Sequence, residues 1–333
     1  MIISRAPVRI TLGGGGTDLK SYYSKHEGSL IAAAIDKYTF VTAHPRFTDN
    51  IRIKYAKIEQ TEDVNEIKHN IFREALKLLD IKCGIELTSL ADVPGRSGMG
   101  TSGSFTVALL NALHAYQRSF ISQRHLAEEA CKIEIDILKE PIGKQDQYMS
   151  AFGGLTHLTF AKDGNVTVEP VRMKEESRDE LENNILIFYT GITRYASKIL
   201  KDQNEKSKKD DKNIIGTLHD IKKIGLQTKS ALEKGDVDKL GEYLDVHWNT
   251  KKQLSKSISN PFIDQCYNLA KKNGALGGKI MGAGGGGFFM FYHNGSNKDK
   301  TQFTKKLSKK NLKKIRFNFD FEGAKILLNM KRF

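Results

Sequence analysis

The segment Pro94–Ser104 reads PGRSGMGTSGS and joins a strand-like stretch, Gly84–Leu90, to an apolar stretch of helical pattern, Ser104–Ser119. Its glycines permit positive φ angles and let backbone N–H groups approach a ligand closely. The first N–H groups of the following helix lack partners within the helix, and the helix dipole favours an anion beside them. The segment therefore predicts an anion-binding loop, with a plain strand-to-helix turn capped by serine as the alternative.

Two standard nucleotide-binding motifs share features with this loop. A Walker A loop requires G-x-x-x-x-G-K-[ST], which neither IGKQ nor GGKI completes. The dinucleotide pattern G-x-G-x-x-G is present from Gly98 to Gly103, but a second helical stretch, Leu126–Lys139, follows where that fold needs a parallel strand. The pattern occurs again at Gly282–Gly287, where it opens a strand instead of a helix. We therefore exclude a dinucleotide site of this type.

Two further glycine runs lie near the ends of the chain. One is in RITLGGGGTD (Arg9–Asp18) and the other is in IMGAGGGGFFMFY (Ile280–Tyr292). Glycine runs are common in flexible linkers. Both of these runs adjoin apolar, strand-like sequence, which is typical of tight loops at strand ends.

The three glycine-rich segments, in this order, resemble the motifs of the GHMP kinases (galactokinase, homoserine kinase, mevalonate kinase, phosphomevalonate kinase). The first is RAPVRITLGGGGTD, the second matches P-x-x-x-G-L-G-S-S-x, and the third is KIMGAGGGGFF. The resemblance implies an α+β protein with a ribosomal-protein-S5-like α/β domain over residues 1–185 and a ferredoxin-like domain over residues 186–333. It also implies that ATP lies in the cleft between the two domains.

The resemblance assigns the ATP phosphates to the second motif, whose N–H groups would cradle them. Matching GLGSS to GMGTS gives Ser102 the place of the family's magnesium-binding serine, and Thr101 keeps a hydroxyl where serine is commoner. Glu134 resembles the family's second magnesium ligand, at an interval one residue shorter than usual; its alternative is a polar position on an amphipathic helix. The implied phosphate-binding residues are Pro94, Gly95, Ser97, Gly98, Met99, Gly100, Thr101, Ser102, Gly103 and Ser104.

The segment IGKQDQY (Ile142–Tyr148) resembles the G-x-x-D-[QN] segment that carries the catalytic carboxylate of the galactokinase and mevalonate kinase branches. This implies that Asp146 accepts the proton of the acceptor hydroxyl during phosphoryl transfer. Arg9 matches the arginine before the first loop in sugar 1-kinases and is implied to steady the transferring phosphate. The alternatives are an exposed loop carboxylate at Asp146 and a surface strand residue at Arg9. Lys144 would lower the pKa of Asp146 or meet a phosphate, with solvent exposure as its alternative.

The first motif is the part of the family's pattern that binds the acceptor. Galactokinases read G-E-H-T-D there, whereas this chain keeps Thr17 and Asp18 but has glycines in place of Glu-His, which leaves room for a larger or differently substituted sugar. Within the family this variant is similar to the D-glycero-D-manno-heptose 7-phosphate 1-kinases, and also to the kinase part of bifunctional fucokinases. A phosphorylated sugar needs basic partners; the candidates, four residues apart on one predicted helix face, are Arg194 and Lys198, with solvent exposure as the alternative. The implied acceptor-binding residues are Gly14, Gly15, Gly16, Thr17, Asp18, Gly284, Gly285, Arg194 and Lys198.

Net charge, cysteine content and hydropathy narrow the classes of partner and the cellular compartment that we expect. The 53 basic and 39 acidic residues give a formal net charge of +14, which suits nucleic acid, an anionic surface or phosphorylated small molecules. Much of the excess lies in Lys198–Asn213 and Asn297–Phe317, at helix-like spacing and without interleaved aromatic residues, so we expect solvated helix faces and no nucleic-acid partner. Three scattered cysteines argue against disulfides and for a reducing compartment. Without an apolar run of about 20 residues or a secretory leader, we expect a cytoplasmic protein with no membrane partner.

Together these features predict a monomeric or homodimeric kinase that uses ATP and Mg²⁺. It would phosphorylate the anomeric hydroxyl of D-glycero-D-manno-heptose 7-phosphate, giving the 1,7-bisphosphate for nucleotide-activated heptose in capsule or surface-polysaccharide synthesis. L-fucose or another free sugar is the alternative acceptor. A non-catalytic regulator and a nucleic-acid-binding protein are alternatives of other classes; the retained Asp146, Ser102 and Glu134 argue against the first, and the third glycine motif argues against the second.

Overall fold

The two longest strands, β1 (Ile2–Gly13) and β2 (Gly28–Pro45), organise the larger of two sheets. In the computed structural model, which describes residues 1–193, 205, 207 and 211–330, they pair antiparallel along almost the whole of β1. Most of β1 and the first half of β2 are buried, as expected for apolar, β-branched strands covered on both faces. The register of this pair shifts between Pro7 and Val8, because Pro7 has no backbone N–H to donate to β2.

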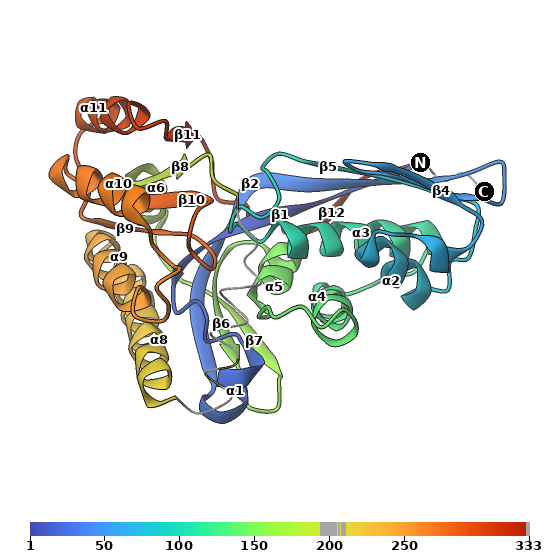
Figure 1. Cartoon of the computed structure of the whole chain (residues 1–333), viewed down its shortest axis with the longest axis horizontal. Helices are drawn as coiled ribbons and strands as arrows, with labels where there is room; N and C mark the ends of the chain where they lie inside the picture. Colours follow the sequence, from blue (N-terminus) through green and yellow to red (C-terminus); the bar gives the residue numbers. More distant parts are fainter. Residues whose placement is uncertain (194–204, 206, 208–210, 331–333) are drawn as a thin grey trace.

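The larger sheet combines both ends of the described chain. Its strand order is β12-β1-β2-β5-β3-β4, and β6 and β7 form a branch on β2. The first half of β2 pairs with β6 and the second half with β5, so β2 bends from one branch of the sheet to the other (Figure 1). The remaining strands are β3 (Ile51–Lys54), β4 (Ile58–Thr61), β5 (Ile85–Ala91), β6 (Leu155–Phe160), β7 (Val166–Pro170) and β12 (Lys325–Asn329).

Helices cover one face of this sheet (Figure 1). The predicted helix at Leu126–Lys139 is present as α4 followed without a break by a π-helical segment, η2. A hairpin that turns at Asp163–Gly164 joins β6 to β7. A short 3₁₀ turn, η1, precedes α2. The bounds are α1 (Lys20–His26), η1 (Val64–Glu66), α2 (Asn70–Leu78), α3 (Thr101–Gln117), α4 (Gln123–Cys131), η2 (Lys132–Ile137) and α5 (Gln145–Phe152).

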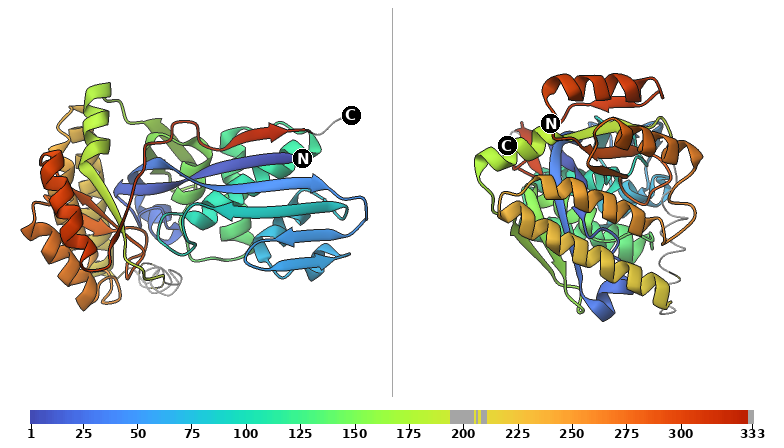
Figure 2. Two further views of the ribbon diagram at one scale, coloured as in Figure 1. Left: turned by 90° about the horizontal axis from the view of Figure 1, so that it is seen from above. Right: turned by 90° about the vertical axis from the view of Figure 1, so that its left-hand side faces the viewer.

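The second sheet confirms the predicted ferredoxin-like half. Its four strands run in the order β11-β8-β10-β9, with every neighbouring pair antiparallel, and helices join β8 to β9 and β10 to β11. This is the β-α-β-β-α-β arrangement, and Figure 2 shows it beside the larger sheet. The elements are α6 (Glu175–Asn184), β8 (Ile185–Tyr189), α8 (Lys212–Glu233), α9 (Asp238–Lys251), α10 (Pro261–Lys272), β9 (Gly277–Ile280), β10 (Phe288–Tyr292), α11 (Asn297–Ser308) and β11 (Lys313–Ile315).

The two halves are not simply consecutive in sequence. The second sheet begins with β8 at Ile185, next to the predicted boundary at residues 185 and 186, but the last strand, β12, returns to the larger sheet and pairs with β1. The division at that boundary stays a prediction, with β12 belonging structurally to the N-terminal sheet. The strand crosses back because β1 otherwise presents an unpaired edge.

The basic segments and the cysteines behave as the sequence indicates where they are described. Most of the lysines of α11 are exposed, as predicted for a solvated helix face; most of the segment Lys198–Asn213 lies outside the described residues. Cys83 is exposed, Cys131 and Cys266 are buried, and all three are free thiols. Among the described residues, each helix is too short or too polar to pass through a lipid bilayer.

Candidate active site

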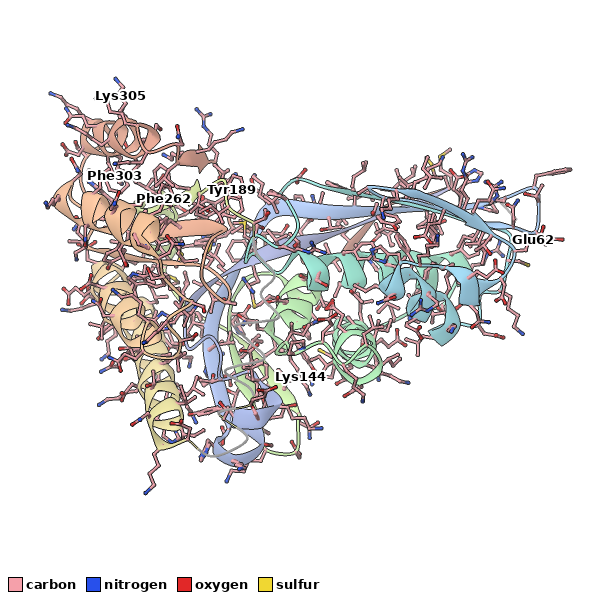
Figure 3. All side chains as sticks on the ribbon, viewed as in Figure 1. Glu62, Lys144, Tyr189, Phe262, Phe303 and Lys305 are labelled. Atoms are coloured by element: carbon pink, nitrogen blue, oxygen red, sulfur yellow. The ribbon has the colours of Figure 1, made fainter. Side chains whose placement is uncertain are left out.

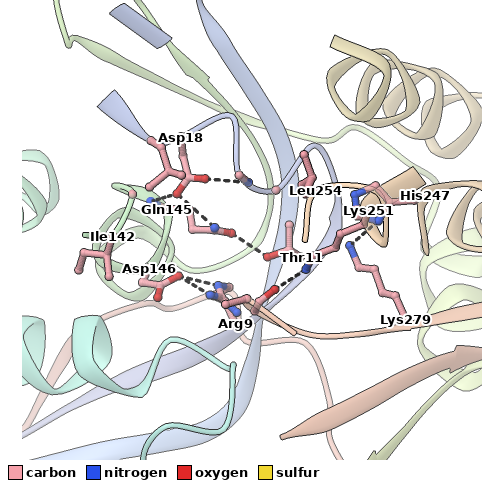
Figure 4. Close-up of a pocket in the computed structure, with 16 residues that line it drawn as sticks. Arg9, Thr11, Asp18, Ile142, Gln145, Asp146, His247, Lys251, Leu254 and Lys279 are labelled. Carbon is pink, nitrogen blue, oxygen red and sulfur yellow. Dashed lines mark hydrogen bonds and ion pairs between the residues drawn. The ribbon is translucent and has the colours of Figure 1, made fainter. Parts of the chain in front are cut away.

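A pocket lies where the start of the chain meets the second half of the fold. Figure 4 shows carboxylates and amides on one wall and basic side chains on the opposite wall. The first wall comes from β1, the loop after it and α5, and the second comes from α9, β9 and the loop after β9. The lining residues are Arg9, Thr11, Gly15, Gly16, Asp18, Leu19, Ile142, Gly143, Gln145, Asp146, His247, Lys251, Leu254, Lys279, Gly282 and Ala283.

Arg9 and Asp146 form an ion pair at this pocket. The Nε and Nη2 atoms of Arg9 lie 2.7 Å and 2.5 Å from Oδ1 of Asp146, and Nη1 donates to the carbonyl oxygen of Gly98 at 2.7 Å. Arg9 is only 3% exposed, so it is not the surface strand residue of the alternative interpretation. Because one oxygen of Asp146 carries both contacts, the other oxygen stays available to accept a proton from a bound hydroxyl.

The glycine loop before α3 has the backbone shape of an anion site. Gly98 and Gly100 have φ angles of 83° and 77°, which L side chains rarely adopt. A Cβ on Gly98 would lie 2.5 Å from the carbonyl oxygen of Met281, so this loop packs tightly on the third glycine segment. Gly100 is the N-cap of α3 and no side chain caps this end. The serine-capped turn is therefore wrong, and the first N–H groups of α3 remain open to an anion.

Other members of the second motif hold the loop in place. Met99 is fully buried in an apolar cluster, and the Ser104 hydroxyl donates to the carbonyl oxygen of Ala6 at 2.7 Å. Ser97 is also buried, with its hydroxyl unpartnered, while Pro94 and Gly95 are exposed. Contacts of these residues with ATP, through their N–H groups, stay predictions.

Glu134, in η2, is fully buried within a polar network. Its Oε1 accepts from Ser102 Oγ at 2.7 Å and from Thr106 Oγ1 at 3.0 Å, and its Oε2 accepts from Gln147 Nε2 at 2.5 Å. Burial raises the pKa of Glu134 to about 7, against the effect of these hydrogen bonds. Glu134 is therefore not an ordinary polar position on an amphipathic helix.

The pair Ser102–Glu134 fits a magnesium ion. Ser102 is exposed at the start of α3, and its hydroxyl links that open position to the buried carboxylate. Both residues supply the hard oxygen atoms that Mg²⁺ prefers. The described residues contain no cluster of three or more histidine, cysteine, aspartate or glutamate side chains placed to hold a metal ion. A magnesium ion here would therefore complete its shell with phosphate oxygens and water, as Mg²⁺ usually does.

Asp18 is the second carboxylate of the pocket. It is 2% exposed, and its oxygens accept from the N–H of Gly16 at 3.0 Å and from the backbone and side-chain amides of Gln145 at 3.3 Å and 3.1 Å. Burial, and then the charge of Asp146, raise the pKa of Asp18. The Thr11 hydroxyl donates to Oε1 of Gln145 at 2.7 Å and completes this chain of hydrogen bonds.

The predicted acceptor-binding residues divide into two groups. Gly15, Gly16 and Asp18 line the pocket, whereas the other members of the glycine runs do not appear among its described lining residues. A Cβ on Gly14 would lie 2.2 Å from the carbonyl oxygen of Ser29, and the buried Thr17 hydroxyl donates to backbone carbonyl oxygens. Gly284 and Gly285 pack on Ile258. Acceptor contacts of Gly14, Thr17, Gly284 and Gly285 stay predictions.

Three predicted basic residues require separate comment. Arg194 and Lys198 lie outside the described residues. Lys144 donates to the carbonyl oxygen of Gly164 at 2.6 Å and lies over the ring of Tyr23, near the β6–β7 hairpin (Figure 3). Its ammonium group therefore has partners away from Asp146.

The structure adds pocket residues that the sequence analysis did not identify. Thr11 and Gln145 orient Asp18, while His247, Lys251 and Lys279 form the basic wall. Lys279 is the first residue of the third motif, KIMGAGGGGFF, where an isolated lysine in an apolar strand is itself a signal. No comparable signal marks His247 or Lys251, which lie on a helix rich in polar residues.

Comparisons with known proteins agree with this geometry. The family model for the GHMP kinases N terminal domain matches residues 67–154, and that for the GHMP kinases C terminal matches residues 228–309. A D-glycero-alpha-D-manno-heptose 7-phosphate kinase from Campylobacter jejuni is 31% identical over 97% of this chain and 98% of its own length. An L-fucokinase/L-fucose-1-P guanylyltransferase from Bacteroides fragilis is 27% identical over 86% of this chain and 34% of its own length.

Solved structures extend the likeness to the whole fold. A crystal structure of a D-glycero-D-manno-heptose 1-phosphate kinase from Bacteroides thetaiotaomicron has a TM-score of 0.82 at 25% identity and covers 99% of this chain and all of the other. An α+β fold with an S5-like and a ferredoxin-like half, which meet at glycine-rich loops, defines a phosphotransferase of the GHMP type. The chain belongs to the GHMP kinase family, and ATP is its phosphate donor.

Proposed function

We propose that this chain is a sugar-phosphate kinase that transfers the γ-phosphate of ATP to the anomeric hydroxyl of D-glycero-D-manno-heptose 7-phosphate. The observation that carries the proposal is the 31% identity to the Campylobacter jejuni heptose 7-phosphate kinase, which extends over 97% of this chain. The product is the 1,7-bisphosphate, a precursor for nucleotide-activated heptose. Capsule or surface-polysaccharide synthesis in the cytoplasm is the setting that fits such a product.

The catalytic roles follow from the contacts at the pocket. The N–H groups of the Pro94–Ser104 loop and the open end of α3 bind the phosphates of ATP. Asp146 accepts the proton of the attacking hydroxyl through its free oxygen. Arg9 orients Asp146 through two short contacts and places positive charge beside the transferring group.

Magnesium belongs to this proposal because Ser102 and Glu134 present suitable oxygen atoms. Bound there, Mg²⁺ supplies charge neutralisation of the ATP phosphates. The buried Thr106 and Gln147 side chains fix the Glu134 carboxylate, so its orientation does not depend on the ion.

The acceptor pocket supports a substituted sugar. Gly15 and Gly16 line it without side chains, while Asp18 presents a carboxylate held by the Gly16 N–H and by Gln145. The pocket therefore combines free space with one fixed acceptor for sugar hydroxyl groups. L-fucose, or another free sugar, is the second candidate acceptor, because the kinase from Bacteroides fragilis matches 86% of this chain.

The test is a coupled ADP-release assay over a panel of sugars and sugar phosphates. Turnover with D-glycero-D-manno-heptose 7-phosphate, and none with L-fucose or D-mannose, is the expected result. The product should yield the starting sugar phosphate again when its anomeric phosphate is hydrolysed by mild acid. Preferential turnover of a free hexose or of L-fucose would overturn the assignment of the acceptor while leaving the kinase class intact.

A further inference from the structure

The wall of the pocket opposite Asp146 carries three basic groups that the proposed mechanism does not use. They are His247 and Lys251, on α9, and Lys279, on β9. His247 and Lys279 are 1% and 2% exposed, and Lys251 is half-buried. Among the described residues, neither lysine forms an ion pair with a carboxylate. Figure 4 shows all three on the wall that faces Asp18 and Asp146.

The hydrogen bonds within this cluster leave part of its donor capacity unused. Lys251 Nζ donates to the carbonyl oxygen of Gly282, and Lys279 Nζ lies 3.3 Å from Nδ1 of His247. When Lys279 is protonated its ammonium group can only donate, so Nδ1 then accepts and the ring proton lies on Nε2. Nε2 is buried and has no partner. Each lysine ammonium group has three N–H donors and only one partner. Each therefore has further N–H donors available to a ligand in the pocket.

The electrostatics of the cluster suit an anion. Burial, followed by repulsion from Arg9, lowers the pKa of Lys251 to about 8. Burial and the neighbouring Lys251 and Arg9 hold the pKa of Lys279 well below its ordinary value, and burial with the two lysines lowers the pKa of His247. The opposing groups are Asp18, whose charge favours protonated Lys251, and Asp146, which is already paired with Arg9. Buried cations without a counter-charge are costly, and a bound anion removes that cost.

We infer that His247, Lys251 and Lys279 bind a phosphate group inside the acceptor pocket. The inference rests on the proposed function, because a sugar phosphate brings two such groups to this pocket: the phosphate already on the acceptor and the phosphoryl group in transfer. Both present the same dianionic oxygen chemistry to the lysines. The site lies on the ferredoxin-like half, so binding a phosphate there joins the two halves across the acceptor.

The primary test measures inorganic phosphate binding to the full-length protein saturated with ADP, which occupies the glycine loop. Variants Lys251→Met and Lys279→Met keep the length of the side chain and remove the charge. We expect each to weaken phosphate binding by about tenfold to a hundredfold, the usual effect of losing a charged hydrogen bond. Lys272→Met, an exposed lysine on α10, is the matched control and should bind as the wild type does. Wild-type phosphate affinity in both pocket variants would overturn the inference.

Steady-state kinetics then separates the two sources of the phosphate group. If the site holds the acceptor's own phosphate, both variants raise KM for heptose 7-phosphate by a larger factor than KM for the unphosphorylated heptose. If it holds the transferring group, kcat falls for both acceptors. Thermal unfolding of each variant checks its fold, and replacement of a buried cation by methionine removes a desolvation cost instead of adding one.

The same experiments keep the inference distinct from the proposed function. Phosphate binding that depends on Lys251 and Lys279, in a protein that does not turn over heptose 7-phosphate, would refute the acceptor assignment only. Turnover of heptose 7-phosphate with phosphate binding unaffected by either variant would refute the phosphate site only. An effect on unfolding alone, with unchanged phosphate affinity, would assign the lysines a purely structural role and contradict the inference.

Discussion

Gly103 lies directly against Asp146, because a Cβ on Gly103 would come within 2.7 Å of the Asp146 Cβ atom. The neighbouring Gly100 is equally close: its Cβ would lie 2.9 Å from Cγ of the same carboxylate. The glycine loop therefore determines how near the start of α3 approaches the Asp146 carboxylate. Glycine at these positions would bring the phosphates of ATP and Asp146 into one site, as the proposed function requires.

Substituting Gly103 tests this packing. Gly103→Ala forces the backbone of α5 away from α3, so we expect kcat to fall about a hundredfold, the effect of a displacement near 1 Å in an active site. Gly216→Ala, on α8, is the matched control, since a Cβ there would meet no atom within 4 Å. The measurement is kcat for both variants under saturating ATP and acceptor. Equal activity of the two variants would refute the packing argument.

Asp146→Asn tests the role of the carboxylate as the base. The amide keeps the shape of the side chain but cannot accept the proton, so we expect turnover to fall by about two to four orders of magnitude. ATP affinity, measured by calorimetry, should change less than about threefold, because the loop N–H groups are untouched. An active Asp146→Asn enzyme would rule out general-base catalysis by this residue.

Arg9→Lys tests whether the forked contact matters beyond its charge. Lysine keeps the positive charge but cannot contact both Asp146 and Gly98 in the same planar geometry. We expect kcat to fall more than KM for the acceptor rises, because Asp146 loses its orientation. Recovery of wild-type kcat with lysine would show that charge alone is needed.

The magnesium site makes a prediction for Ser102→Ala. The change removes the exposed hydroxyl and leaves one oxygen of the buried Glu134 with Thr106 as its remaining donor. We expect the Mg²⁺ concentration for half-maximal activity to rise at fixed ATP, while the unfolding temperature changes little. Titration of activity with Mg²⁺ measures this, with Gly216→Ala again as the control. An unchanged magnesium requirement would remove Ser102 from the site.

The lowered pKa of Lys251 predicts a pH dependence of stability. Its pKa is about 8 in the folded chain against an ordinary value of 10.5, because burial and Arg9 disfavour the charged form. Between these values the unfolded chain binds the extra proton, so this lysine destabilises the fold fully below pH 8 and progressively less up to pH 10.5. The penalty is of the order of 3 kcal/mol. The difference in urea unfolding free energy between wild type and Lys251→Met, in phosphate-free buffer, should therefore shrink as the pH rises through this window; a constant difference would contradict it.

Local sequence patterns predicted much of the fold. The strand-like stretch Gly84–Leu90 corresponds to β5, and the helical stretches Ser104–Ser119 and Leu126–Lys139 correspond to α3 and to α4 with η2. Strand pairing could not be predicted from local patterns, because it depends on contacts between segments that are distant in the sequence. The return of β12 to β1 is the clearest case, since nothing within Lys325–Asn329 says which edge it joins.

The site was predicted in the same uneven way. Arg9, Asp18, Ser102, Glu134 and Asp146 belong to motifs of fixed local spacing, and the structure brings Arg9 to Asp146 and Ser102 to Glu134. The residues of the basic wall do not form a local motif, because they come from a helix, α9, and a strand, β9, that are separated in the sequence by α10. The lowered pKa values of these residues arise because the fold buries them next to one another and to Arg9.

The sequence by itself determined the family, because its motifs depend on residues close together in the chain, and it predicted the anion-binding loop and the catalytic carboxylate. Only the tertiary structure decided which glycines line the pocket and which pack against the backbone, since the same φ freedom serves both purposes. The tertiary structure also placed Lys251 and Lys279 opposite Asp146. Burial converts those two lysines from solvated charges into an unpaired basic wall, and burial is a property of the folded chain.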